Sequence, residues 1–148
     1  LTRSMMRLRE SLSGIADFAP LTVEPEPVLS LGAFSFDNDL FDDYLDRIAA
    51  AGINIPVIPG ILPIHNFEQT MVFSAKCGTS IPQWLARRFA GLTNDPGTRK
   101  LVGVSVACEQ VMDLVDRGIN DFHFYTMNRA DLVYAICHIL GVRANDGA

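Results

Sequence analysis

The stretch VLSLGAFSFDNDLFDDYLDRIAAAG, residues 28–52, decides the fold class. Its opening part is apolar and partly alternating, as in a strand that is buried on both faces. Asp37 then offers a side chain that can cap a helix, and apolar residues recur at helical spacing after it. Gly52 suits the position just beyond a helix end. The stretch therefore predicts a strand followed by a helix.

A second unit of the same kind follows directly. Residues 53–62 form another apolar, β-branched run, and Pro56 is expected at its entry because proline cannot donate to a central ladder. His65 or Asn66 is expected to cap the next helix, which Gly78 ends. The order strand, helix, strand, helix is typical of a parallel sheet.

In the third unit, two helices are expected before the strand. We expect helices over residues 80–91 and from about Thr98 to Asp116, a strand over 121–128 and a last helix over 129–140. On the longer of these helices, one stripe of apolar side chains is expected to face the core: Leu101, Val104, Cys108, Val111 and Leu114. Three parallel strands lack neighbours at their open edges, so we expect an α/β fold that is an incomplete part of a (β/α)8 barrel.

Residues 1–27 differ from the rest of the chain. They are rich in arginine and then in proline, which predicts a short helix followed by an extended loop. We therefore divide the chain into an atypical segment, 1–27, and a unit of βα elements, 28–148.

The composition limits the kinds of molecule that this protein is expected to bind. The 148 residues carry 12 Lys and Arg against 17 Asp and Glu, a net charge of −5, which argues against a nucleic-acid partner. No apolar run is long enough to span a membrane, and we expect no secretory signal among these residues. The three cysteines, Cys77, Cys108 and Cys137, fit reduced thiols in the cytoplasm better than a disulfide framework.

Ligands of βα folds bind where the strands end, which points to residues 37–39, 60–69 and 125–129. Pro59 and Pro63 enclose Gly60 in a segment that is either a rigid turn holding a ligand against bare backbone or an ordinary strand exit. No motif for a metal, a phosphate loop or a nucleophilic triad is present. The three histidines, including His65, are scattered and are expected to be ordinary surface or core residues.

Three side chains in these segments could contact a ligand. Gln69 and Phe73 lie one turn apart on the same helix face, where an amide could read a heterocycle and a ring could stack on it. Core packing for Phe73 and a solvated or capping role for Gln69 are the alternatives. Arg129 opens the last helix at the end that disfavours a cation, so it either serves a carbonyl-bearing or anionic ligand or is solvated beside Asp131.

Several segments together resemble the C-terminal part of methylenetetrahydrofolate reductases. The matching segments are FDNDLF at 36–41, IPGILPI at 58–64, KLVG at 100–103, DFHFYTMNRA at 121–130 and YAICH at 134–138. The resemblance covers about residues 34–143 without a gap. The same motifs in the same order are far more specific than any one of them.

The resemblance implies a flavin-dependent TIM-barrel enzyme. In that family NAD(P)H reduces FAD, and the reduced flavin passes a hydride to 5,10-methylenetetrahydrofolate, giving 5-methyltetrahydrofolate for one-carbon metabolism and methionine synthesis. By this resemblance Gln69 contacts pterin and nicotinamide, Phe73 stacks on folate or the folded nicotinamide cofactor, and Arg129 contacts bound ligand. The catalytic acid and most FAD contacts belong to earlier strands, so no catalytic residue is expected in this chain, and FAD is not expected to stay bound to it alone.

The chain also departs from the family pattern. Ala33 stands where the family has a Gln before its strand end, Ser35 replaces an aromatic residue, and residues 1–32 do not match. Losing a buried amide that orients substrate costs about 1–3 kcal/mol. The alternative function is therefore a non-catalytic remnant that binds a planar metabolite or a partner subunit. The open strand edges also allow a homo-oligomer.

Overall fold

The computed structural model describes residues 5–7 and 31–142. The described residues form one mixed sheet in the order β1-β4-β3-β2. Its strands are β1 (Met5–Arg7), β2 (Leu31–Phe34), β3 (Val57–Ile61) and β4 (Asp121–Phe124). β2, β3 and β4 are parallel, and β1 pairs antiparallel with β4. The parallel core of the sheet agrees with the α/β class predicted from the sequence.

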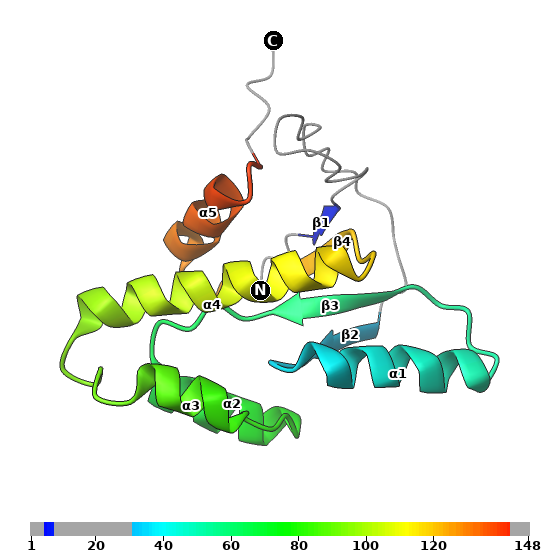
Figure 1. The fold of residues 1–148 in the computed structure, drawn as a ribbon, viewed down its shortest axis with the longest axis horizontal. Helices are drawn as coiled ribbons and strands as arrows, with labels where there is room; N and C mark the ends of the chain where they lie inside the picture. The colour runs from blue at the N-terminus through cyan, green and yellow to red at the C-terminus, as the bar shows by residue number, and fades with distance from the viewer. Residues whose placement is uncertain (1–4, 8–30, 143–148) are drawn as a thin grey trace, which may run out of the picture.

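Helices connect the parallel strands. The longest of these helices lies among the others, which pack around it. They are α1 (Asn38–Ala50), α2 (Phe67–Cys77), α3 (Gln83–Phe89), α4 (Pro96–Asp116) and α5 (Ala130–Ile139). Figure 1 shows α4 running across the molecule, with α2 and α3 beside its first half, α1 beside its second half and α5 on the opposite side. α4 therefore contacts elements from both ends of the described chain.

Side-chain caps explain where three of these helices begin. The Asp37 carboxylate accepts from the Asp39 amide at the start of α1, and the Asn66 side chain accepts from the Gln69 amide at the start of α2. Of the two caps considered for α2, Asn66 is therefore correct. Asp95 accepts from the Thr98 amide, so α4 begins at Pro96, earlier than predicted, because proline fits the first turn of a helix.

The strand β4 presents different residues to its two faces. Phe122 and Phe124 are buried in the main core, whereas His123 and Tyr125 project from the other face, because successive side chains alternate along a strand. β4 ends at Phe124, so the predicted strand 121–128 was too long. Met127 and Asn128 both have positive φ, 46° and 61°, which turns the chain out of the sheet.

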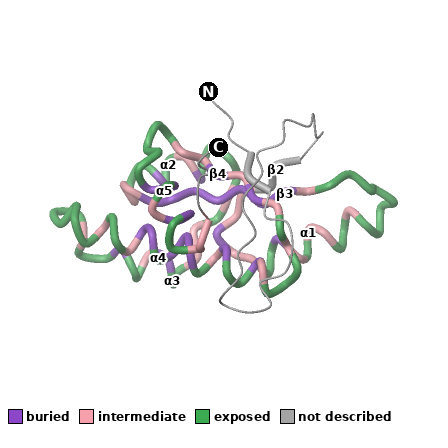
Figure 2. Tube along the Cα trace, turned by 90° about the horizontal axis from the view of Figure 1, so that it is seen from above, coloured by how far each residue is buried: buried purple, intermediate pink, exposed green. Residues whose placement is uncertain are grey.

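The apolar side chains form two clusters. The larger joins α1, α4 and α5 to β3 and β4 around Ile61, Leu114 and Ile136, and the smaller lies beneath α2 and α3 around Leu85 and Ile64. Figure 2 shows burial concentrated in β3, β4 and the inner side of α4, whereas the connection from α1 to β3 is exposed.

Two sequence expectations need correction. Leu101, expected on the packed stripe of α4, is 72% exposed, whereas the other four residues of that stripe are buried. Met5–Arg7 are extended in β1, although a short helix was expected in this segment. The rest of that expectation, residues 8–27, lies outside the described residues.

Candidate functional site

The loop that leaves β3 is fixed by α4. Ile64 in this loop is 1% exposed, and a Cβ on Gly103 of α4 would lie 1.9 Å from the Ile64 carbonyl oxygen, so only glycine permits this approach. Arg99 of α4 donates through Nε to the His65 carbonyl at 3.0 Å and through Nη1 to the Thr93 carbonyl at 2.9 Å. The loop therefore presents the His65 side chain from a firmly held backbone.

His65, Gln69 and Arg129 form one group at this loop. Burial lowers the pKa of the His65 imidazole below its ordinary value, and the nearby positive charges of Arg129 and Arg99 lower it further. The carboxylate of Asp131 and a hydrogen bond with the Gln69 side chain act in the opposite direction on this pKa. Burial and the neighbouring positive charges therefore favour the neutral form of the imidazole, whose pKa responds to both the Gln69 amide and the Arg129 guanidinium.

Arg129 is positioned by a tight turn and by a carboxylate. Its amide donates to the Thr126 carbonyl at 2.7 Å, across the two positive-φ residues that follow β4. Its Nε lies 3.5 Å from Asp131 Oδ1, and Lys100 of α4 donates to the other oxygen at 2.8 Å. The Lys100 hydrogen bond is the main cause that lowers the pKa of Asp131, with Arg129 contributing. The guanidinium stays 46% exposed, so it can still bind another group.

Phe73 faces the aromatic side chains at the strand ends. Its ring centroid lies 5.7 Å from that of Phe34 at the end of β2 and 6.4 Å from that of Tyr125 directly after β4. Tyr125 also meets Phe34 and His123 edge to face, at 5.9 and 4.7 Å between centroids. Phe73 is only partly buried, so it both packs on the smaller core cluster and keeps an accessible portion.

Of the two structures considered for the segment around Gly60, the ordinary strand exit is correct, because β3 ends at Ile61 within this segment. Pro59, Gly60 and Ile61 lie within β3, and the ladder continues when the Tyr125 amide donates to the Ile61 carbonyl at 2.9 Å. A Cβ on Gly60 would lie 2.5 Å from Tyr125 Cε2. The bare backbone at Gly60 therefore accommodates the tyrosine ring, which in turn meets Phe34 and His123.

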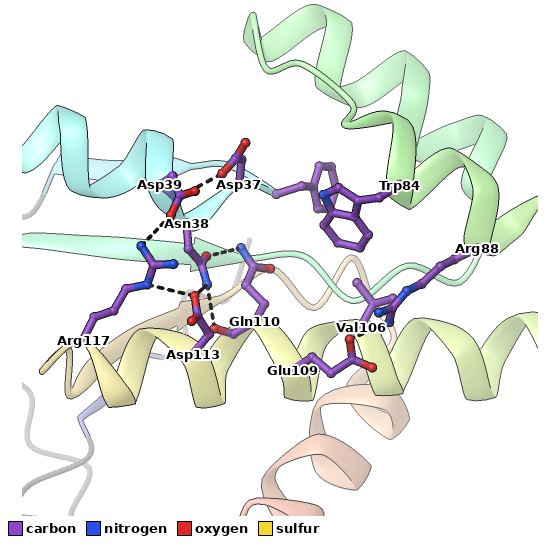
Figure 3. A pocket seen from close by; sticks show the side chains of 11 residues that line it. Asp37, Asn38, Asp39, Trp84, Arg88, Val106, Glu109, Gln110, Asp113 and Arg117 are labelled. Atoms are coloured by element: carbon purple, nitrogen blue, oxygen red, sulfur yellow. Dashed lines mark hydrogen bonds and ion pairs between the residues drawn. The ribbon is translucent and has the colours of Figure 1, made fainter.

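Away from this group, a concave region lies between α1, α3 and α4. It is a cleft of about 280 Å³, and Figure 3 shows its polar side chains turned toward one another. Asn38 donates to Asp113 at 2.7 Å, and Arg117 pairs with Asp113, Asp39 and Asp42. On the opposite wall the Arg88 guanidinium lies 5.4 Å from the centre of the Trp84 ring and pairs with Glu109. These mutual contacts make the cleft a junction between helices.

The structure brings the three predicted site residues to one end of the sheet. The pKa of His65 responds to both Gln69 and Arg129, so both lie near it. Phe73 shares α2 with Gln69 and packs near Phe34 and Tyr125 at the strand ends. His65 was missed, because sequence reasoning treated the histidines as scattered. Its spacing of one helical turn before Gln69 was the available signal, whereas its approach to Arg129 depends on tertiary structure.

No helix among residues 5–7 and 31–142 is long and apolar enough to cross a membrane. Within the same part of the chain, no group of three or more His, Cys, Asp or Glu side chains is arranged to hold a metal ion.

Comparison with known proteins identifies the family. Residues 30–141 match the family model for methylenetetrahydrofolate reductase. The chain is 49% identical over 110 residues to the 5,10-methylenetetrahydrofolate reductases of Pectobacterium carotovorum and Escherichia coli, covering 74% of this chain and 37% of each relative. It is 35% identical over 107 residues to methylenetetrahydrofolate reductase 1 of Schizosaccharomyces pombe, covering 72% of this chain and 18% of that relative. The chain thus spans little more than a third of the bacterial relatives, and it belongs to the methylenetetrahydrofolate reductase family.

Proposed function

We propose that this chain supplies part of the ligand-binding mouth of a methylenetetrahydrofolate reductase, as C-terminal βα units of a (β/α)8 barrel. The activity would be FAD-mediated hydride transfer from NAD(P)H to 5,10-methylenetetrahydrofolate. One observation carries the proposal: Gln69, Phe73 and Arg129 gather where β2, β3 and β4 end, which is where βα folds bind their ligands.

Each of the three side chains suits a planar, polar ring. Phe73 can stack on a pterin or nicotinamide face with its accessible portion, supported from behind by Phe34 and Tyr125. Gln69 and Arg129 can donate hydrogen bonds to the edge of the same ring. The guanidinium also suits the carbonyl or carboxylate groups of either ligand.

The described residues do not by themselves fit FAD. A flavin dinucleotide needs a long cleft with cations for its pyrophosphate. The cleft between α1, α3 and α4 is instead lined by Asp37, Asp39, Glu109 and Asp113, and its two arginines are already paired. We therefore assign no flavin contact to this chain and expect the chain alone to be colourless and inactive in NADH oxidation.

Ligand titration of the purified 148-residue chain tests the proposal. We expect 5-methyltetrahydrofolate or NADH to bind, and Gln69→Ala, Phe73→Ala or Arg129→Ala to weaken binding about fivefold or more in calorimetry. Gln83→Ala and Arg87→Ala on the exposed side of α3 are matched controls that should bind normally. Equal losses in both sets, or no binding by the wild-type chain, would contradict the proposal. A flavin absorbance spectrum retained on purification would contradict the absence of a flavin site.

Ala33 favours a second candidate, a remnant that binds a planar metabolite or a partner subunit without catalysis. Ala33 lies in β2 in register with Pro59, beside the strand ends that carry the site. A methyl group cannot make the hydrogen bonds of an amide there. If Ala33→Gln raises folate affinity while the wild-type chain binds only weakly, this second candidate gains support.

A further inference from the structure

The strand β1 has the wrong direction for a barrel strand. β2, β3 and β4 all run the same way, whereas β1 runs against β4. Every strand of a (β/α)8 barrel is parallel to the neighbours on both of its edges. β4 has β3 on one edge and β1 on the other, so Met5–Arg7 occupy an edge that a barrel gives to a parallel strand.

The direction of the backbone identifies the groups of β4 that face β1. The Tyr125 amide donates to the Ile61 carbonyl at 2.9 Å, so the backbone groups of Tyr125 point toward β3. Because these groups alternate between the two edges of a strand, those of Phe122, three residues earlier, point toward β1. Met6 lies opposite Phe122 in the register. In an antiparallel pair of this kind the two residues exchange both N–H···O bonds.

This edge of β4 needs a partner. Phe122 is 0% exposed, and buried backbone N–H and C=O groups without a hydrogen bond cost free energy. A strand edge without a covering strand is also a template for pairing with another chain. A very short strand is one of the devices that protect such an edge, and Met5–Arg7 have this length.

We propose that Met5–Arg7 are a removable cap on the outer edge of β4, which keeps a second copy of this chain from pairing there. An edge that accepts one antiparallel strand can also accept β4 of another molecule, related by a two-fold axis. β1 pairs with β4 alone, and the ladder of β2, β3 and β4 does not run through it. The parallel part of the sheet can therefore persist when β1 leaves.

The cap has a consequence for barrel closure, and this step rests on the proposed function. The family model matches residues 30–141, so β4 lies within the region shared with the family and β1 lies outside it. A parallel barrel strand can be added at the outer edge of β4 only after β1 has left. The cap itself follows from the sheet order and does not depend on any ligand.

Hydrogen exchange of the full, ¹⁵N-labelled chain tests the cap. We expect the Phe122 amide to be protected in the wild type and to exchange about tenfold faster or more in Met6→Pro, because proline has no N–H to donate. Met6→Val keeps the N–H and is the matched control, in which Phe122 should be as protected as in the wild type. The Tyr125 amide, which faces β3, should stay protected in all three proteins.

Self-association provides the second readout. In sedimentation velocity, Met6→Pro should form more dimer than Met6→Val at the same concentration, because its β4 edge is open. Unchanged exchange of Phe122 in Met6→Pro, or equal association of the two variants, overturns the proposal. Loss of protection at both Phe122 and Tyr125 also overturns it, because β1 would then support the whole sheet and would not be removable.

A disulfide trap tests the same register without a proline. Residues opposite each other in an antiparallel pair have Cα atoms about 4.5–5.5 Å apart, a distance that a disulfide can span. When Cys77, the exposed native thiol, is replaced by Ser, Met5→Cys with His123→Cys should cross-link within one chain on oxidation. Arg7→Cys with His123→Cys is the control, because this pair is offset by two residues and lies about 7–8 Å apart.

The outcomes of the trap separate the cap from the proposed function. Equal cross-linking of the two cysteine pairs overturns the cap. The oxidised pair at Met5 and His123 should also associate less in sedimentation than its reduced form, and the reverse order would contradict the cap equally. Failure of the wild type to bind folate or NADH instead overturns the proposed function, whereas the exchange and cross-linking data still decide the role of β1.

Discussion

The backbone of Gly103 lies directly against the carbonyl group of Ile64, where an added Cβ would come within 1.9 Å of the oxygen. Because the neighbour is backbone in a buried loop, it cannot rotate away as a side chain could. We expect Gly103→Ala to lower the free energy of unfolding by about 2 kcal/mol or more, measured by urea denaturation.

Gly97→Ala is the matched control on the same helix. Its Cβ would meet only Asp95 Oδ1 at 3.6 Å, and alanine favours helix over glycine by about 0.8–1 kcal/mol. This variant should be neutral or stabilised. Similar destabilisation of both variants would show that the contact with Ile64 is not the cause.

A second glycine supports the aromatic group at the strand ends. Gly60→Ala would place a Cβ 2.5 Å from the Tyr125 ring, which has to move and lose part of its contacts with Phe34 and His123. We expect a loss of about 1–3 kcal/mol in unfolding free energy. When Tyr125 is already replaced by Leu, Gly60→Ala should lower the unfolding free energy by less, with a difference of about 0.5 kcal/mol or more. If the effects of the two substitutions simply add, the contact between Gly60 and Tyr125 is not the cause.

The lowered pKa of His65 predicts a specific pH dependence of stability. The unfolded chain takes up a proton near the ordinary value of 6.5, whereas the folded chain resists it, so the unfolded state binds more protons between the two pKa values. The contribution of His65 to stability is therefore complete above pH 6.5 and is lost as the pH falls through the folded pKa. Thermal unfolding between about pH 5 and 8 should show this loss in the wild type and a smaller one in His65→Gln.

The aspartates with shifted pKa values titrate at lower pH than His65. Their titration therefore does not obscure the pH dependence of stability expected from His65. The pKa values of Asp95, Asp113 and Asp131 are lowered from 3.8, chiefly by hydrogen bonds to Thr98, Asn38 and Lys100 respectively. Their contributions are present above that value and are lost below it. A pH profile of His65→Gln identical to the wild type between about pH 5 and 8 would contradict the assignment to His65.

The three cysteines are present as thiols and should differ in reactivity. Cys77 at the end of α2 is exposed, whereas Cys108 and Cys137 are buried, and burial raises the pKa of both thiols. Thiolate is the reactive form, so a thiol reagent at pH 8 should label one cysteine quickly and two slowly. Cys77→Ser should abolish the fast phase, and denaturant should make all remaining thiols fast. A persistent fast phase in Cys77→Ser would indicate that a core helix opens readily.

Local signals in the sequence predicted most of the helices and the parallel order of the strands. Asp37 and Gly52 mark the two ends of α1 as expected, with Gly52 at φ 74°, because capping depends on residues next to each other in the chain. The start of α4 was placed too late because Asp95-Pro96-Gly97 was interpreted as a break, although an Asp cap followed by proline is also a helix start. The end of β4 was missed because Met127 and Asn128 carry no turn signal as strong as glycine.

Only part of the candidate site could be predicted from the sequence. Placing ligand contacts at strand ends required no more than the βα order, and the structure does bring Gln69, Phe73 and Arg129 to that region. Of the two alternatives at Gly60, the ligand-holding turn was wrong, because the ring that occupies the space beside its backbone belongs to Tyr125, which follows a different strand. His65 was overlooked for the same reason, since Arg99 and Arg129 approach it from α4 and α5.

The first turns of α4 hold both sides of the site at once. Arg99 and Gly103 fix the loop before Gln69, and Lys100 binds Asp131 beside Arg129. The spacing between Gln69 and Arg129 is therefore set by one rigid helix on the outside of the sheet. Among the described residues β2 is the edge strand beyond β3, and a change at that edge would leave this spacing nearly unchanged, so the extent of the sheet and the spacing of these two side chains are separable properties.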